Sequence, residues 1–180
     1  MTITTCVDAP MWAAKRRTPR THAFSFPTSA ACFVSMYSVV LQLGLAAERP
    51  VTAPRTQAIV QETVDTLRTS LSVEHLVAVS IVANNTRVVS VAAPSEPGGP
   101  FQLAIEAIFM DSLTDDELIA ALAHELGHVW VFTHHPYLQT ERLANEIAMR
   151  VVDRASLERV YGKMWAREGT NGDLVSFLGR

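Results

Sequence analysis

Two histidines and a glutamate lie close together in residues 124–128, which read His-Glu-Leu-Gly-His. On an α-helix, side chains four positions apart project from the same face, so the imidazoles of His124 and His128 can reach one metal ion. Imidazole nitrogens are common ligands of zinc, and Glu125 lies beside the coordination position that such a site leaves open for water. The pattern therefore predicts zinc-dependent peptide hydrolysis, with Glu125 as the general base.

The residues on either side of this pattern indicate that it lies on a helix. Thr114 and Glu117 form a capping box, and the acidic residues between them suit the positive end of a helix dipole. Apolar residues then recur at helical spacing through Val129, and Pro136 disfavours helix at the residue before it. The sequence therefore predicts a buried helix that carries both histidines.

A catalytic zinc ion usually has three protein ligands, and two candidates for the third follow the pattern. His134 lies ten residues after His124, as in the long histidine motif of the metzincins, but Val131 replaces the glycine that turns the chain there. Without this turn, His134 points away from the metal. Glu141, at the start of the next predicted helix, is the type of carboxylate that a gluzincin uses, and the small Ala144 allows the helices to approach closely. We favour Glu141 as the third ligand, with His134 as the alternative.

Residues from about 76 to 165 resemble the core of the HtpX-like and CAAX-prenyl-endopeptidase gluzincins, in particular their minimal versions without the large membrane part. The matching features are a strand pair, a further strand with a loop, residues 113–118, the Ala-Leu-Ala-His-Glu-Leu-Gly-His segment at 121–128, and a Glu-x-x-Ala segment from Glu141. The family has Asp at the end of this last segment, whereas this chain has Asn145, a form that also resembles the ImmA/IrrE-type peptidases. The resemblance implies that Glu141 is the third ligand and that Asn145 orients a ligating histidine through its amide oxygen.

The motif and the resemblance together predict a zinc-dependent endopeptidase that holds one zinc ion per chain and acts on a peptide or protein. A zinc-bound water attacks the scissile carbonyl, and Glu125 takes its proton and delivers it to the leaving amine. Four side chains are candidates to stabilise the oxyanion, and the sequence does not choose among His134, His135, Tyr137 and Tyr161. The alternative functions are a module that binds a metal or peptide without hydrolysis, and a structural helical domain in which the motif is accidental.

The apolar patterns along the chain predict an α+β fold. Predicted helices lie at residues 56–72, 114–132, 140–152 and 156–168, and predicted strands at 75–82, 87–91 and 101–106. Asparagines between the first two strands favour a hairpin there. The expected fold is a small, mostly antiparallel sheet packed against the histidine-bearing helix and further helices, the zincin-like arrangement of a minimal gluzincin.

The strand at residues 101–106 comes shortly before the predicted metal helix. In many zinc peptidases an edge strand in this place holds the substrate, because a free strand edge offers backbone donors and acceptors. We therefore expect Phe101, Leu103 and Ile105 to belong to a substrate-binding edge strand, with an ordinary sheet strand as the alternative.

Residues 1–47 have the order of a secretory signal. A basic cluster at residues 15–20 precedes an uncharged run from Thr21 to Ala47, which ends in small residues. An uncleaved membrane anchor is the alternative, because the apolar part could just span a bilayer. In both cases we expect the domain to be exported to the periplasm, the extracellular space or the outer side of a membrane. Any association with a membrane would then involve only this N-terminal segment. The expected organisation is a signal peptide or anchor at 1–47, a linker at 48–55 and a zincin-like metallopeptidase domain at 56–180.

The composition of the 180-residue chain suits one domain with an appendage. Apolar residues make up 48% of the chain, which is ample for a core, and a net charge of -3 does not predict nucleic-acid binding. Both cysteines, Cys6 and Cys32, precede the predicted domain. That domain therefore has neither a disulfide nor a cysteine-ligated metal site available to it.

Overall fold

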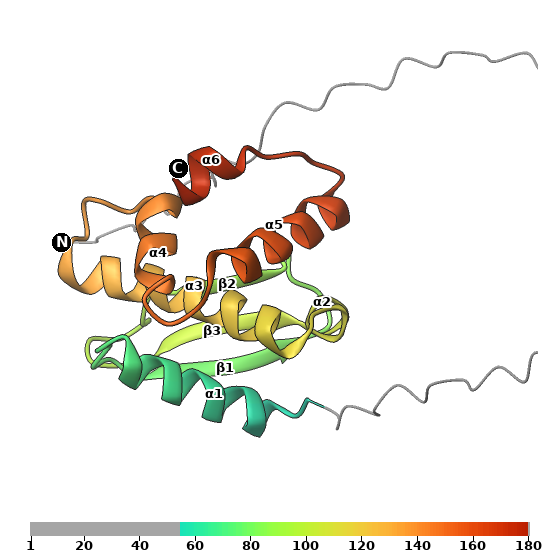
Figure 1. Cartoon of the computed structure of the whole chain (residues 1–180). Coiled ribbons are helices and arrows are strands. Elements are labelled where there is room, and N and C mark those ends of the chain that lie inside the picture. The colour runs from blue at the N-terminus through green and yellow to red at the C-terminus, as the bar shows by residue number, and fades with distance from the viewer. Residues whose placement is uncertain (1–54, 180) are drawn as a thin grey trace, which may run out of the picture. The chain divides into compact units, whose positions relative to one another are not determined.

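The computed structural model describes residues 55–179. The predicted signal peptide or anchor at 1–47, most of the linker at 48–55 and both cysteines lie outside the described residues. The described part has the predicted α+β class (Figure 1). In chain order its elements are α1 (Gln57–Ser70), β1 (Val77–Val82), β2 (Val89–Ala92), β3 (Phe101–Glu106), α2 (Ala107–Ser112), α3 (Asp115–His134), α4 (Glu141–Ala148), α5 (Arg154–Glu168) and α6 (Leu174–Leu178). Among these helices, none has the length and apolar character needed to cross a bilayer.

The three strands form a mixed sheet with β3 in its centre. β1 pairs with β3 in parallel, with Val77 opposite Phe101, and β2 pairs with β3 antiparallel, with Val91 opposite Leu103. The predicted hairpin of the first two strands is wrong, because β3 lies between them. The expectation that Phe101, Leu103 and Ile105 belong to an edge strand is also wrong. These three side chains are at most 3% exposed, and the most deeply buried strand takes the central position.

The outer edge of β1 is covered by a side chain of α1. The Gln61 Nε2 atom donates to the Val77 carbonyl oxygen at 2.9 Å, and Gln61 Oε1 accepts from the Val79 N–H group at 2.9 Å. An amide side chain offers the same donor and acceptor pair as a peptide group, so Gln61 substitutes for a further strand. The first part of this edge, from Val77 to Val79, is therefore protected against pairing with another chain.

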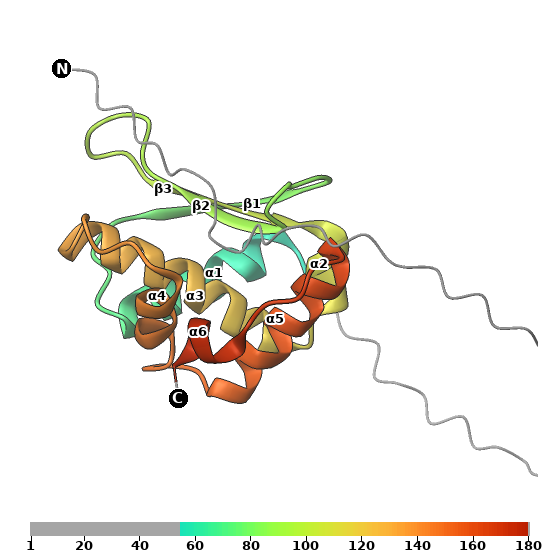
Figure 2. The ribbon, with the colours of Figure 1, turned by 90° about the horizontal axis from the view of Figure 1, so that it is seen from above.

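The long helices lie on one face of the sheet, as Figure 2 shows. α1 and α3 pack against the strands, and α4 and α5 contact α3 in turn. α3 is consequently enclosed on several sides, and Leu122, Leu126, Val129 and Val131 are all 0% exposed. The predicted buried helix is confirmed, and it extends two residues beyond Phe132, to His134.

Two short helices have no counterpart in the sequence prediction. α2 follows β3 directly and has no side-chain cap at its start, so nothing in the local sequence marks it. α6 is five residues long, too short for a helical period to be recognised. Its one local signal is Asp173, whose carboxylate accepts from the Val175 N–H group at 3.0 Å.

The first turn of α3 is fixed to α5 through a buried carboxylate. Thr114 and Glu117 form the predicted capping box, in which Glu117 Oε2 accepts from the Thr114 N–H group at 2.7 Å. The same oxygen accepts from Lys163 Nζ at 2.5 Å, and Arg159 lies 3.4 Å from the other carboxylate oxygen. Burial of Glu117 favours its neutral form, but the hydrogen bonds from Lys163 and Thr114 outweigh this and lower its pKa.

We predict that Glu117→Gln lowers the free energy of unfolding by about 1–3 kcal/mol at neutral pH, because Gln keeps the cap but loses the charge that Lys163 faces. A carboxyl whose pKa is lowered in the folded state stabilises the protein above its unfolded pKa, and this contribution is lost as the pH falls through the folded value. The difference between wild type and variant should therefore shrink in acid. Urea unfolding at neutral and acidic pH measures it, and an equal difference at both would contradict the assignment.

Candidate metal centre

Both histidines of the motif project from the middle of α3 toward one point. Their rings meet edge to face, and the His124 Nε2 and His128 Nε2 atoms are 3.2 Å apart. Glu125 lies between them in sequence and is buried, with 8% of its surface exposed. The helix therefore places the three residues of the motif as their spacing predicts.

Glu141 reaches the same point from the first turn of α4. Thr140 caps this helix, since its hydroxyl accepts from the Leu143 N–H group at 3.1 Å, and it holds Glu141 at the positive end of the helix dipole. The Glu141 Oε2 atom lies 3.2 Å from His124 Nε2 and 3.6 Å from His128 Nε2. Two helices thus contribute to a cluster in which one ligand atom from each residue lies within 4.8 Å of the others.

The distances within this cluster suit a zinc ion. Zinc binds nitrogen and carboxylate oxygen at about 2.0–2.1 Å with tetrahedral geometry, which separates neighbouring donor atoms by about 3.3 Å. The three observed separations are 3.2, 3.2 and 3.6 Å. His124, His128 and Glu141 could therefore hold one metal ion without rearrangement and leave a fourth position open.

The close contact of α3 with α4 depends on Gly127. A Cβ atom at this position would lie 2.3 Å from the carbonyl oxygen of Ala144 and 2.9 Å from its carbonyl carbon. Contacts this short do not occur, so any side chain at residue 127 would force the helices apart. The sequence predicted that the small Ala144 allows this approach, and the structure shows that the glycine within the motif is also needed for it. Their contact brings Glu141 to the histidines.

Burial and charge act on the ionisable groups of the cluster in opposite directions. Burial favours the neutral form of Glu141, but hydrogen bonds and charges of His124 and His128 outweigh it and strongly lower its pKa. Burial also disfavours protonated His124, yet the Glu141 carboxylate raises the pKa of that imidazole overall. For Glu125 burial prevails, and its pKa is raised although both histidines act to lower it. The two carboxyl groups thus differ in basicity, with Glu125 the stronger base.

Asn145 contacts His124 on the edge of the ring that faces away from the cluster. The Asn145 side chain is fully buried on α4, one turn after Glu141. Its Oδ1 atom lies 2.8 Å from His124 Nδ1, which leaves His124 Nε2 directed at Glu141. This is the contact that the sequence resemblance implied for Asn145, and it fixes the rotation of the imidazole.

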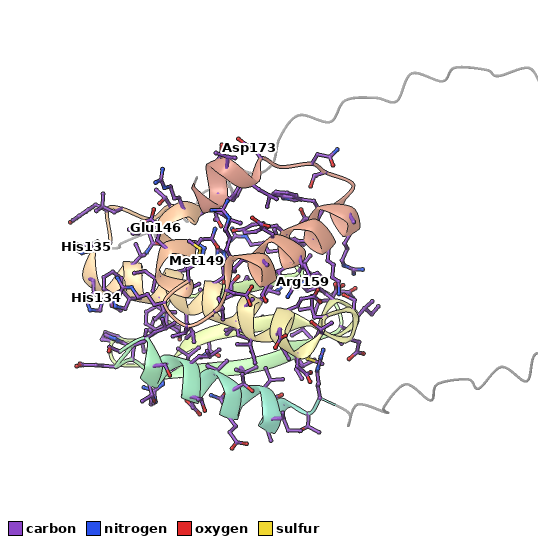
Figure 3. The ribbon with its side chains drawn as sticks, viewed as in Figure 1. His134, His135, Glu146, Met149, Arg159 and Asp173 are labelled. Carbon is purple, nitrogen blue, oxygen red and sulfur yellow. The ribbon has the colours of Figure 1, made fainter. Side chains whose placement is uncertain are left out.

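The other predicted residues are not brought to the cluster. Figure 3 shows His134 and His135 at the outer end of α3. The His134 ring is stacked on Trp130 at 4.1 Å, because α3 continues through Val131 as expected in the absence of a glycine. Tyr137, which follows in the loop to α4, is 98% exposed. Among the described residues, His134 is therefore not part of the possible metal cluster, and a role of His134, His135 or Tyr137 in stabilising an oxyanion stays a prediction.

Tyr161 lies close to the cluster but behind it. Its ring meets His124 edge to face at 5.9 Å, and its hydroxyl oxygen accepts from Asn145 Nδ2 at 2.8 Å. Burial, together with the negative charge of Glu141, raises the pKa of Tyr161, which keeps its hydroxyl protonated. Because Asn145 contacts the outer edge of His124, this hydroxyl supports the site from behind and does not face the open coordination position.

Arg87 is a residue near the site that no sequence pattern indicated. It comes just before β2, and its positive charge acts on Glu125, where it lowers the pKa against the effect of burial. The next residue, Val88, has a positive φ of 65°, an uncommon conformation for a β-branched residue. The chain therefore turns sharply next to Arg87. The sequence contains no sign of this charge near Glu125, because it depends on how the sheet packs on α3.

Comparison with known proteins does not assign this chain to a family. No protein-family model matches it, and no curated protein matches it. The crystal structure of the metallopeptidase zymogen of Pyrococcus abyssi abylysin is similar, with a TM-score of 0.45 and 14% sequence identity over 63% of this chain and 99% of that chain. A likeness of this extent does not establish an activity, so the case for a function depends on the geometry of the cluster.

We predict that Gly127→Ala separates α3 from α4 and weakens binding of a metal ion, with zinc as the probe, by about 10–100-fold, because the Glu141 carboxylate moves away from the histidines. The free energy of unfolding should also fall by about 1–3 kcal/mol. Competition with a chelating indicator and urea unfolding measure the two effects.

Gly162→Ala on α5 is the matched control, because a Cβ atom there has no neighbour within 4 Å. This variant should bind zinc as wild type does and gain up to about 1 kcal/mol, since alanine favours a helix more than glycine. Equal zinc affinity of Gly127→Ala and wild type would contradict the role of the interhelical contact.

Proposed function

We propose that this chain is a zinc-dependent endopeptidase whose metal ligands are His124, His128 and Glu141. The observation that carries the proposal is the spacing of the three donor atoms, which are 3.2, 3.2 and 3.6 Å apart and match the edges of a zinc tetrahedron. The set of two imidazoles and one carboxylate, with a position left open, is that of a catalytic and not a purely structural zinc site.

Glu125 is the general base in this proposal. A bound zinc ion would lower the pKa of water and polarise the scissile carbonyl. Glu125 is next in sequence to His124 and has a raised pKa, so it can accept a proton from the attacking water and donate it to the leaving amine. Glu141 is the weaker base, because the histidines lower its pKa, and it therefore suits the role of a ligand better.

The outer edge of β2 is the strand edge that can bind an extended peptide. β3 has partners on both sides, and Gln61 covers part of the edge of β1. The Glu106 N–H group donates to the Val88 carbonyl oxygen at 2.8 Å, so the backbone groups of Val88 face β3. In an antiparallel ladder alternate residues face the partner strand, and the backbone groups of Val91 therefore face outward. β2 also packs against α3, which carries the histidines. We therefore propose that β2, and not β3 as the sequence predicted, pairs with the substrate.

The location and substrate of the enzyme are proposed from the sequence. The order of charged and apolar residues at 1–47 supports export, with the domain acting in the periplasm, outside the cell or on the outer side of a membrane. A peptide or protein is the proposed substrate, because strand pairing uses backbone groups that every extended peptide has.

We predict that Glu125→Gln keeps a full equivalent of zinc but lowers the rate of peptide hydrolysis by about 10²–10⁴-fold, the usual contribution of a positioned base. Metal analysis of the purified protein and cleavage of an unfolded protein substrate measure the two quantities. His124→Ala is the control, since it should lose the zinc as well.

Three outcomes would count against the proposal. Hydrolysis that survives Glu125→Gln would remove this residue from its role. Zinc far below one equivalent in wild type, unchanged by His124→Ala, would exclude the metal site. Stoichiometric zinc without hydrolysis of any peptide would favour the alternative of a binding module.

We further predict that Val91→Pro lowers kcat/KM for peptide substrates by about tenfold, because proline removes the outward N–H group that a paired peptide would accept from. Proline is tolerated on an edge strand when the lost N–H faces outward, so folding and zinc content should be retained. Val91→Ala controls for the side chain and should cleave as wild type does. Undiminished cleavage by Val91→Pro would show that substrates do not pair with β2 at this residue.

A further inference from the structure

The buried amide of Asn145 uses both of its N–H groups and one lone pair of its oxygen. Its Oδ1 atom lies 2.8 Å from His124 Nδ1. Its Nδ2 atom donates to the Tyr161 hydroxyl oxygen at 2.8 Å and to the backbone carbonyl oxygen of Phe177 at 3.0 Å. The last of these partners belongs to α6, close to the end of the described chain. A metal ligand is thus linked to the C-terminal helix through one side chain.

The three partners differ in how strongly they determine the orientation of this amide. A tyrosine hydroxyl can donate or accept, and so can a neutral imidazole, depending on its tautomer. A backbone carbonyl can only accept. With the amide reversed, Asn145 Oδ1 would face the Phe177 carbonyl oxygen at about 3 Å, and two buried acceptors would be opposed without a proton between them. Phe177 is therefore the partner that determines which end of the amide faces His124.

The orientation of the amide in turn determines the tautomer of His124. An amide oxygen at 2.8 Å accepts only if His124 carries its proton on Nδ1. The Nε2 atom is then the one left to bind a metal ion, and it faces Glu141 and His128. Without a metal ion, a second proton on Nε2 can be donated to the Glu141 carboxylate. The opposite tautomer would place a proton where a metal ion must bind.

We propose that α6 is a positioning element of the metal site: the Phe177 carbonyl orients the Asn145 amide, which selects the tautomer of His124 that can bind a metal. This inference rests on the proposed metal site and assigns to the C-terminal segment a role that its sequence does not suggest. It also accounts for an amide at residue 145, because an aspartate has no N–H group to offer the Phe177 carbonyl.

α6 is held in place by contacts that can be changed without touching the metal ligands. The Leu178 side chain is 3% exposed, and Arg154 donates to the carbonyl oxygens of Leu178 and Gly179 at 3.2 and 2.9 Å. The Phe177 ring lies 5.2 Å from the ring of Tyr161. Val175, on the same helix, is 51% exposed and serves as a matched control position.

The first test is whether His124 carries a proton on Nδ1 in the metal-free, full-length protein, read from the ¹⁵N shifts of its ring whatever the state of Nε2. Wild type and Val175→Ala should show the proton on Nδ1. Leu178→Ala, which loosens α6, should show a mixture of tautomers and bind zinc about 10–100-fold more weakly. A Leu178→Ala protein with the tautomer and zinc affinity of wild type would overturn the proposal.

Asn145→Asp is the second test and remains decisive if Leu178→Ala does not fold. A carboxylate is the stronger acceptor for His124, so an account without α6 predicts equal or tighter zinc binding. Our proposal predicts weaker binding and a lower melting temperature, because the second carboxylate oxygen would face the Phe177 carbonyl. Equal or tighter binding would overturn it.

Failure of this inference can be told apart from failure of the proposed function. If wild type binds no zinc, the proposed function fails, and the tautomer of the metal-free protein still decides the role of α6. If wild type binds zinc but neither variant changes the tautomer or the affinity, the role of α6 fails and the metal site stands.

Discussion

The contact between Gly127 and Ala144 is the constraint on which the metal centre depends. Two histidines one helical turn apart can converge on a metal by themselves, but the third donor must come from another element. α4 brings Glu141 within 3.6 Å of both imidazoles only because the backbone of Ala144 lies where a side chain of residue 127 would be. The glycine in the motif is thus a packing residue, and the distance between α3 and α4 determines how close Glu141, a candidate ligand, comes to the two histidines.

The closeness of α4 to the histidines also gives Glu141 and Glu125 different pKa values. Glu141 lies against both imidazoles, and their attraction outweighs the cost of its burial, so it is ionised and suited to bind a cation. Glu125 is the more buried of the two, and for it burial prevails, so its pKa is raised. The roles of ligand and base that we propose for Glu141 and Glu125 thus follow from a difference in the surroundings of two side chains of the same type.

The orientation of His124 depends on contacts from α5 and α6. Two buried carboxylates form ion pairs with side chains of α5. Lys163 pairs with Glu117 at the start of α3, and Arg167 pairs with Glu106 at the end of β3. Tyr161, also on α5, accepts from the Asn145 amide, which donates its second N–H group to the Phe177 carbonyl of α6. Helices that provide no metal ligand thus determine how His124 is rotated and, in our proposal, where its proton lies.

Local patterns in the sequence determined the helix that carries His124 and His128, its capping box and the start of the helix that carries Glu141. Even the choice of Glu141 over His134 followed from a local feature, the missing glycine at Val131. Strand order, the central position of β3, the charge of Arg87 near Glu125 and the contact of Phe177 with Asn145 were decided by the tertiary structure alone. The physical reason is that helix caps and helical periods involve neighbours in sequence, whereas strand pairing, interhelical contacts and buried polar networks join residues that only the folded core brings together.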